Sequence, residues 1–324
     1  MASFLTLLTL ISFFTCTFSQ GGEDLGVGFY STTCPNAEKI VASVVQQAVA
    51  ANRNMAAILV RLHFHDCFVT GCDASILIDQ GPTSERHAFG HQGVQGFDVI
   101  ESAKAQLEAA CPGVVSCADI VALAARDSIA LSNGPAYEVP TGRKDGRVSN
   151  VSLASDMPEV GESVEQFKAK FLRKGLSTKD FVLLTAAHTI GTTACFFMTD
   201  RLYKFPTFGS DPTINTAFLP ELKAKCPENG DVNVRLGIDH NSEGIFDDQI
   251  LRNIKNGFAV LASDAKLYTD EETKDVIDSY IGGLSFLFGP SFVNDFAESM
   301  VKMGRIGVKT GDQGEIRRVC KAFN

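Results

Sequence analysis

Residues 61–68, with the sequence RLHFHDCF, combine a fixed cation, a titratable base, an aromatic ring and a carboxylate. On an α-helix, positions i and i+4 share a face, so Arg61 and His65 would point the same way while His63 would point elsewhere. A face that presents one base and one guanidinium suits the cleavage of a polar O–O bond, because the base moves a proton and the guanidinium stabilises developing negative charge. A single Arg/His pair also arises by chance on amphipathic helices, so other features must decide between the two interpretations.

Helical periodicity dominates the rest of the sequence and predicts a mainly α-helical protein. Apolar residues recur at helical spacing over residues 37–51, 56–68, 97–110, 116–131, 164–174, 181–188, 248–257, 271–281 and 291–303. Ser177 and Asp180 match a capping box in form, which favours a helix start just before residue 181. Strand signals are few and short. The Gly-, Asp- and Arg-rich residues 140–150 are the predicted divide between two halves of the chain.

A second histidine of interest, His188, ends the apolar segment 181–188. A single histidine in such a place is more often a core residue whose nitrogens are satisfied. The alternative is specific, because a neutral imidazole on an apolar wall can ligate haem iron, and a carboxylate on its other nitrogen strengthens it as a donor. Asp264 is a candidate for that carboxylate, although spacing alone does not bring it to His188.

Oxygen-rich clusters follow both histidines. Asp66, Asp73 and Ser75 follow His65, and Thr189, Asp239, Ser242 and Asp247 follow His188. Calcium takes six to eight oxygen ligands, many of them carboxylates and backbone carbonyls. The same residue types also form turns, and from the residues alone the two interpretations are about equal.

The composition indicates a secreted protein. Residues 1–19 are uncharged, with an apolar centre too short to span a bilayer, which is typical of a signal peptide. Nine cysteines are present; Cys16 lies in this segment, and the other eight predict four disulfides, with zinc binding as the alternative. The net charge of −9 argues against nucleic acid as a partner, and no other segment is apolar enough to suggest a membrane span. Asn150 begins a sequon and is a candidate for glycosylation.

Taken together, these motifs make the chain similar to the class III secretory plant peroxidases, the horseradish peroxidase family. The motifs are RLHFHDCFVTGCDASIL at 61–77, SCADI at 116–120, AAHTIG at 186–191 and RLY at 201–203. The resemblance covers residues 20–324 and implies a two-part all-helical fold with haem between a distal half, about 20–140, and a proximal half, about 141–324. It also implies the disulfides Cys34–Cys111, Cys67–Cys72, Cys117–Cys320 and Cys195–Cys226.

The resemblance implies roles for individual residues. His65 would be the distal acid–base residue and Arg61 the distal cation, with Phe64 lining the distal face; His188 would be the axial ligand of the haem iron, with Asp264 as its partner. A distal calcium would take Asp66, Val69, Gly71, Asp73 and Ser75, with Glu85 reaching it through water. A proximal calcium would take Thr189, Asp239, Ser242, Ile245 and Asp247. Pro158 would lie at the rim where aromatic donors dock, with Phe89 and Phe197 near the access channel.

The implied function is that of a secreted peroxidase with one haem b and two calcium ions. Hydrogen peroxide would be reduced to water while small phenolic donors are oxidised by one-electron steps. The family resemblance further suggests a monomer that acts outside the cell, in the apoplast or cell wall, with roles in phenol oxidation and in the response to oxidative stress.

The chain departs from the family pattern at several positions. His91 replaces the asparagine that usually accepts a hydrogen bond from the distal histidine, and a histidine there could make the site sensitive to pH. Residues 92–97 are one residue short of the usual segment, and Ile238 replaces a common phenylalanine. The sequence has no tryptophan, and Tyr137 occupies the place of the family's usual one.

Two other functions are compatible with these departures. One is a calcium-stabilised wall protein with this fold but little turnover, and lack of haem absorbance would favour it. The other is a non-haem metalloenzyme built on His63 and His65, which the divergence of these side chains on a helix disfavours.

Overall fold

The computed structural model describes residues 25–283 and 289–324; the predicted signal peptide, with Cys16, lies outside them. The described chain is mainly α-helical, as the sequence predicts. Its helices are α1 (Ala37–Ala51), α2 (Met55–Cys67), α3 (Phe97–Ala110), α4 (Cys117–Leu131), α5 (Val164–Arg173), α6 (Thr178–Thr185), α7 (Thr199–Tyr203), α8 (Leu219–Lys225), α9 (Gln249–Asn256), α10 (Ala262–Lys266), α11 (Glu271–Ile281) and α13 (Phe292–Met303). Short 3₁₀ segments are η1 (Ser75–Leu77), η2 (Glu85–His87), η3 (Phe89–His91), η4 (Val151–Asp156), η5 (Ala186–Thr189) and η6 (Cys195–Met198). Strands β1 (Thr192–Ala194) and β2 (Arg235–Gly237) pair antiparallel.

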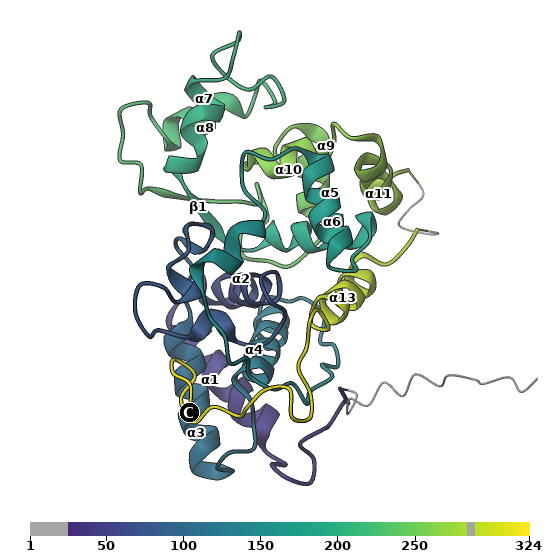
Figure 1. Ribbon diagram of the computed structural model, residues 1–324. Helices are drawn as coiled ribbons and strands as arrows, with labels where there is room; N and C mark the ends of the chain where they lie inside the picture. The colour runs from purple at the N-terminus through teal and green to yellow at the C-terminus, as the bar shows by residue number, and fades with distance from the viewer. Residues whose placement is uncertain (1–24, 284–288) are drawn as a thin grey trace, which may run out of the picture.

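Helices α1 to α4 form the first part of the molecule, drawn in purple and blue in the lower half of Figure 1. Helix α4 lies at its centre, since it packs against α1, α2 and α3. Its Ala-rich sequence suits this place, because small side chains let neighbouring helices approach closely. The Ser116 hydroxyl accepts a hydrogen bond from the backbone N–H of Asp119 and so begins the helix with an N-cap.

Helices α5, α6, α9, α10 and α11 form the second part, in the upper half of Figure 1. Its core holds a cluster of phenylalanines, in which Phe171 packs against Phe181 with ring centroids 4.7 Å apart. The capping box predicted for Ser177 and Asp180 is confirmed: each side chain accepts from the other residue's backbone N–H. Helix α6 then packs against both α11 and α13.

The C-terminal segment returns to the first part of the molecule. After α13 the chain runs back to end beside α3, as the terminus marked in Figure 1 shows. Backbone bridges join Lys144 to Lys309 and Asp145 to Glu315, and a disulfide joins Cys117 to Cys320. The segment after α13 therefore contacts both α4 and residues 144–145, and so ties the two parts together. A boundary between halves near residues 140–150 remains a prediction.

Four disulfides link the eight cysteines of the described residues in the pairs that the resemblance implies. They are Cys34–Cys111, Cys67–Cys72, Cys117–Cys320 and Cys195–Cys226. The zinc alternative for these cysteines is therefore wrong. No helix within the described residues is both long and apolar enough to cross a membrane.

One helix differs from its predicted bounds near the site. The sequence predicts a helix over 181–188, but α6 begins at Thr178 and ends at Thr185. The chain then tightens into the 3₁₀ segment η5, which contains His188. A tighter last turn is common at helix ends because i→i+3 bonds satisfy carbonyls that the α-helix leaves free. His188 is thus presented by a short turn and not by the helix itself.

Candidate active site

Helix α2 turns one face toward the core of the first part and another toward the second part. Leu59 and Leu62 are almost fully buried in the first core, whereas Arg61 is exposed and Phe64 is only half-buried. The Arg61 guanidinium donates to the backbone carbonyl of Gln92, 3.2 Å away. The His65 ring packs edge-on against Phe64 with centroids 5.5 Å apart. The i, i+4 spacing therefore places the cation and the base on the same side, as the sequence predicts.

His65 forms a hydrogen bond with His91, the residue that replaces the family's usual asparagine. The Nδ1 atoms of His65 and His91 lie 2.8 Å apart, and both rings are buried. The Nε2 atom of His91 lies 3.5 Å from Oε1 of Glu85, which is fully buried. A carboxylate can only accept, so we assign the His91 proton to Nε2 and leave His91 Nδ1 as the acceptor. His65 then carries its proton on Nδ1, and its Nε2 is free to act as a base.

The surroundings of His65 favour this neutral form. Burial lowers the pKa of His65 well below its ordinary value, and the positive charge of Arg61 and the neighbouring His91 lower it further. A histidine that remains neutral well below pH 6.5 can take a proton throughout the mildly acidic range.

The second predicted histidine meets its predicted partner. His188 Nδ1 donates to Oδ1 of Asp264 at 2.9 Å, and the Asp264 side chain is fully buried. Burial disfavours the charged ring, but the Asp264 carboxylate outweighs it and raises the pKa of His188. With Nδ1 engaged, Nε2 is the free ligating atom, and 38 % of the His188 side chain remains exposed. The ring is held by a carboxylate on one side and open on the other, which is the arrangement of a metal-ligating histidine.

The two histidines belong to walls that face one another. The charge of Arg61 on α2 is close enough to lower the pKa of His188, although Asp264 outweighs it. On β2, Arg235 adds to the burial that lowers the pKa of Arg61. In Figure 1, α2 lies at the top of the first part, directly below the second part. Helix α2 contacts η5, and the residues Arg61, Phe64 and His188 that these two elements carry each keep part of the side chain exposed. This set of a free imidazole nitrogen, an aromatic face and a guanidinium fits a haem held between the two walls.

Comparison with known proteins agrees with this geometry. Residues 41–282 match the Peroxidase family. The chain is 65 % identical to Peroxidase 43 of Arabidopsis thaliana over 315 residues, which is 97 % of each protein. It is 51 % identical to Peroxidase N1 of Nicotiana tabacum over 325 residues, covering 100 % of this chain and 97 % of that one. The chain belongs to the class III plant peroxidases. It is therefore a haem peroxidase that reduces hydrogen peroxide while it oxidises donor molecules.

In this peroxidase the predicted distal calcium residues converge beneath α2. The Thr70 hydroxyl lies 3.3 Å from both carboxylate oxygens of Asp73 and 3.1 Å from the Ser75 hydroxyl. Burial raises the pKa of Asp66 well above its usual range, and the charges of Asp73 and Glu85 add to it. Among the described residues, buried Oδ1 of Asp66 accepts no hydrogen bond, and the Glu85 carboxylate meets the Nε2 atom of His91 only at 3.5 Å, too long for a normal hydrogen bond. Buried carboxylates that repel one another and lack donors fit a cation site.

The predicted proximal calcium residues also come together. The Thr189 hydroxyl donates to Oδ2 of Asp239 at 2.7 Å, and the carbonyl oxygen of Ile245 and Oδ1 of Asp247 lie 3.1 and 3.4 Å from the same hydroxyl. The Ser242 hydroxyl donates to the other oxygen of Asp247. Burial raises the pKa of Asp239 to about 7, which indicates a carboxylate without enough positive charge around it. These residues fit a second cation site despite the substitutions around them.

Sequence reasoning did not identify Asn253 at this second cluster. Its amide donates to Oδ1 of Asp239 at 2.6 Å and to the carbonyl of His240 at 2.8 Å, and so fixes that carboxylate. The residue lies on α9, where helical periodicity gives it a buried position but no sign of its partner.

The predicted rim residues lie in two places. Phe89 is 77 % exposed and begins η3, which contacts η4 close to the half-buried Pro158. Phe197 lies in η6, directly after β1, and packs edge-on against Phe196. Phe89 thus lies in a segment that contacts η4, shortly before Pro158 in the chain, whereas Phe197 lies in η6, which contacts β1.

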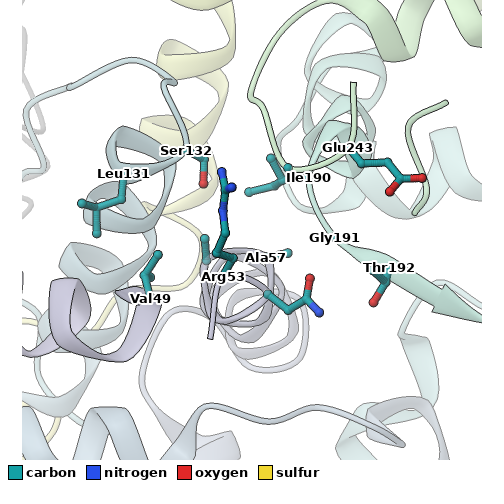
Figure 2. Close-up of a pocket in the computed structure, with 12 residues that line it drawn as sticks. Val49, Arg53, Ala57, Leu131, Ser132, Ile190, Gly191, Thr192 and Glu243 are labelled. Atoms are coloured by element: carbon teal, nitrogen blue, oxygen red, sulfur yellow. The ribbon is translucent and has the colours of Figure 1, made fainter. Parts of the chain in front are cut away.

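A cavity of about 220 Å³ lies beside the site and is separate from it. Figure 2 shows it between the ends of α1 and α4 and the segment that follows η5, with the Arg53 side chain reaching into it. Gly191 lies against Ala57 at its edge, and none of Arg61, His65 and His188 lines it. This cavity is distinct from the space in front of the histidines.

Two remaining sequence predictions concern His63 and Asn150. His63 is buried near Cys67, with its Nδ1 atom 3.6 Å from that disulfide sulfur, and burial lowers its pKa to about 3. Its cysteine neighbours are oxidised, so no metal site forms there. Asn150 is exposed and caps η4, with its Oδ1 accepting from the N–H and hydroxyl of Ser152.

Proposed function

We propose that His188 ligates the iron of one haem b and that Asp264 orients it and strengthens it as a donor. The support is the 2.9 Å bond from Nδ1 to a fully buried carboxylate, which leaves Nε2 facing open space. Phe64 and Arg61 would lie on the opposite face of the haem. When bound, the haem supplies the iron at which peroxide is reduced.

His65 acts as the proton-transfer group in this proposal. Its Nε2 takes the proton of hydrogen peroxide and returns it to the oxygen that leaves as water. Arg61 stabilises the negative charge that develops on that oxygen. The hydrogen bond from His65 to His91 carries the proposal, because it fixes the tautomer in which Nε2 is unprotonated.

Two calcium ions would stabilise the walls on either side of the haem. The distal ion would take oxygens from Asp66, Val69, Gly71, Asp73 and Ser75, with Glu85 through water. The proximal ion would take oxygens from Thr189, Asp239, Ser242, Ile245 and Asp247. The unpartnered buried carboxylates at the first site and the converging hydroxyl and carboxylates at the second support this assignment.

We propose that the donors are small phenols that dock near Phe89 and Pro158 at the rim. The location of this peroxidase outside the cell, as a monomer glycosylated at Asn150, is part of the same proposal. Four disulfides and the exposed sequon support an oxidising, extracellular setting.

Replacing the distal base tests these assignments. We expect His65→Ala to retain the Soret absorbance of bound haem but to react with hydrogen peroxide about a thousandfold more slowly, because proton transfer is lost. Stopped-flow absorbance measures the rate. His87→Ala, which changes an exposed histidine on η2, is the control and should leave the rate unchanged. A near-normal rate in His65→Ala would refute the role of His65, and a chain without Soret absorbance would favour a wall protein without turnover.

A further inference from the structure

Two lysines reach the oxygen atoms of the proposed distal calcium site. The Lys309 ammonium pairs with Oδ2 of Asp73, whose side chain is 2 % exposed. The Lys174 ammonium donates to the carbonyl of Val69 at 2.7 Å. Both oxygens belong to the ligand set proposed for calcium, so the site already holds positive charge supplied by the chain.

The lysines come from elements that are distant in sequence from the loop that they contact. Lys174 directly follows α5. Lys309 lies in the segment that follows α13, and this segment packs against the loop of residues 69–73. In this segment the carbonyl of Ile306 accepts from the N–H of Cys72 at 2.8 Å. Gly71 and Gly307 are so close that a Cβ on Gly71 would lie 2.5 Å from the Gly307 carbonyl oxygen. The ammonium of Lys309 is thus delivered by a backbone that is fixed against the loop.

The charged groups around the loop of residues 69–73 indicate the role of Lys309. Asp66, Asp73 and Glu85 contribute three buried carboxylates, and Lys309 is the cation paired with one of them. The buried guanidinium of Arg317 also lies nearby, but it donates to backbone carbonyls such as that of Ala74. The carboxylates of Asp66 and Glu85, which pair with no lysine or arginine among the described residues, still fit a divalent cation, while Asp73 has a partner without it.

We propose that Lys309, aided by Lys174, is a built-in cation that shares the distal site with calcium. The ammonium repels a divalent ion at the same carboxylate, so calcium binds more weakly than it would beside a neutral side chain. The same ammonium neutralises Asp73 when calcium leaves, so removal of calcium destabilises this peroxidase less. This inference rests on the proposed distal calcium site.

Calcium titration of the haem-containing protein, stripped of metal with a chelator, tests the proposal. We expect Lys309→Met to bind calcium at the distal site about tenfold more tightly, since one repelling unit charge is removed. Asp73→Asn identifies which of the calcium-binding steps belongs to this site. Lys302→Met is the matched control, because Lys302 also pairs with a buried carboxylate, that of Asp180, but on α13. It should leave calcium affinity unchanged.

Thermal unfolding with and without calcium gives a second readout that does not depend on activity. We expect calcium to raise the unfolding temperature more in Lys309→Met than in the parent, because the variant without calcium leaves Asp73 buried and unpaired. A variant that folds only when calcium is present supports the proposal equally. Lys309→Arg keeps the charge and should behave as the parent in both assays.

The outcomes separate the inference from the proposed site. If the parent binds a distal calcium and Lys309→Met binds it no more tightly, or if Lys309→Arg changes as much as Lys309→Met, the role of Lys309 is refuted. If the distal site of the parent takes no calcium but that of Lys309→Met does, the ammonium has replaced the ion and the inference is supported. If neither protein binds calcium there, both the distal site and this inference are wrong.

Discussion

His65, His91 and Glu85 form a chain of buried polar groups that begins at the proposed base. The 2.8 Å contact between the two histidines requires one of them to donate and the other to accept. The nearby carboxylate of Glu85 decides this in favour of donation by His65. The same carboxylate belongs to the proposed distal calcium set, so the base and the calcium loop are linked through His91.

His91→Asn should change how the peroxide reaction depends on pH. Burial, Arg61 and His91 together lower the pKa of His65, so in the parent the rate should stay level as pH falls through about 6.5 and decline only at lower pH. Asparagine has no ionisable ring, so the variant loses the contribution of His91 to the lowered pKa of His65. The rate of the variant should therefore begin to fall at a higher pH than that of the parent. Stopped-flow rates from about pH 8 to about pH 4 measure this. Identical profiles for the two proteins would contradict it.

At the scale of residues, the relative positions of side chains that are close in sequence were the easiest to predict. Arg61 and His65 share a face because helical geometry fixes the i, i+4 relation. Asp264 required the family resemblance, because it lies 76 positions from His188. Lys309 could not have been predicted, since it contacts Asp73 across 236 positions and nothing in its local sequence marks it.

At the scale of elements, the turn that carries His188 depends on close packing against α2. Gly191 has a φ of +108°, and a Cβ added to it would lie 2.8 Å from that of Ala57. A side chain here would be strained and would also separate η5 from the helix that carries Arg61 and His65. The spacing between the two walls is therefore set in part by one glycine.

Gly191→Ala should destabilise this peroxidase by about 2 to 4 kcal/mol, from backbone strain and overpacking together. Gly175→Ala is the matched control, because Gly175 also has a positive φ, +80°, but open space around it. It should cost about 1 kcal/mol. Denaturant unfolding of the two variants measures the difference. Equal losses would show that the contact with Ala57 does not hold the turn.

Long helices were predicted from the sequence more closely than short segments. Helices α1, α3 and α11 have the predicted bounds because several turns of apolar periodicity end at clear breaks. Helices α7, α8 and α10 have five to seven residues, too few to show a period, and were not predicted. The early end of α6 also escaped prediction, because its last apolar residues continue the helical pattern into η5.

At the scale of the whole molecule, no tryptophan and no fully exposed tyrosine is present to relay oxidation from the haem to large donors. The sequence has no tryptophan. Its five tyrosines, Tyr30, Tyr137, Tyr203, Tyr268 and Tyr280, all lie in described segments, and each is buried or half-buried. We therefore expect oxidation to take place where a donor reaches the haem itself.

This arrangement predicts a preference for small donors. We expect kcat/KM for a polymeric phenol to be at least about tenfold lower than for the matching monomer, because a bulky polymer has less access to the haem than a monomer. Steady-state rates with a monomeric lignin precursor and its soluble polymer, at equal phenol concentration, measure the ratio. Comparable values for the two would show that a surface route exists.

The central claim is that His188 holds a haem whose other face is served by His65 and Arg61. The absorption spectrum of the protein purified with haem and calcium, recorded before and after an equimolar addition of hydrogen peroxide, tests it most directly. We predict a Soret band that shifts on addition of peroxide and returns when a small phenol is added. A Soret band that does not respond to peroxide, or the lack of any Soret band, would contradict the claim.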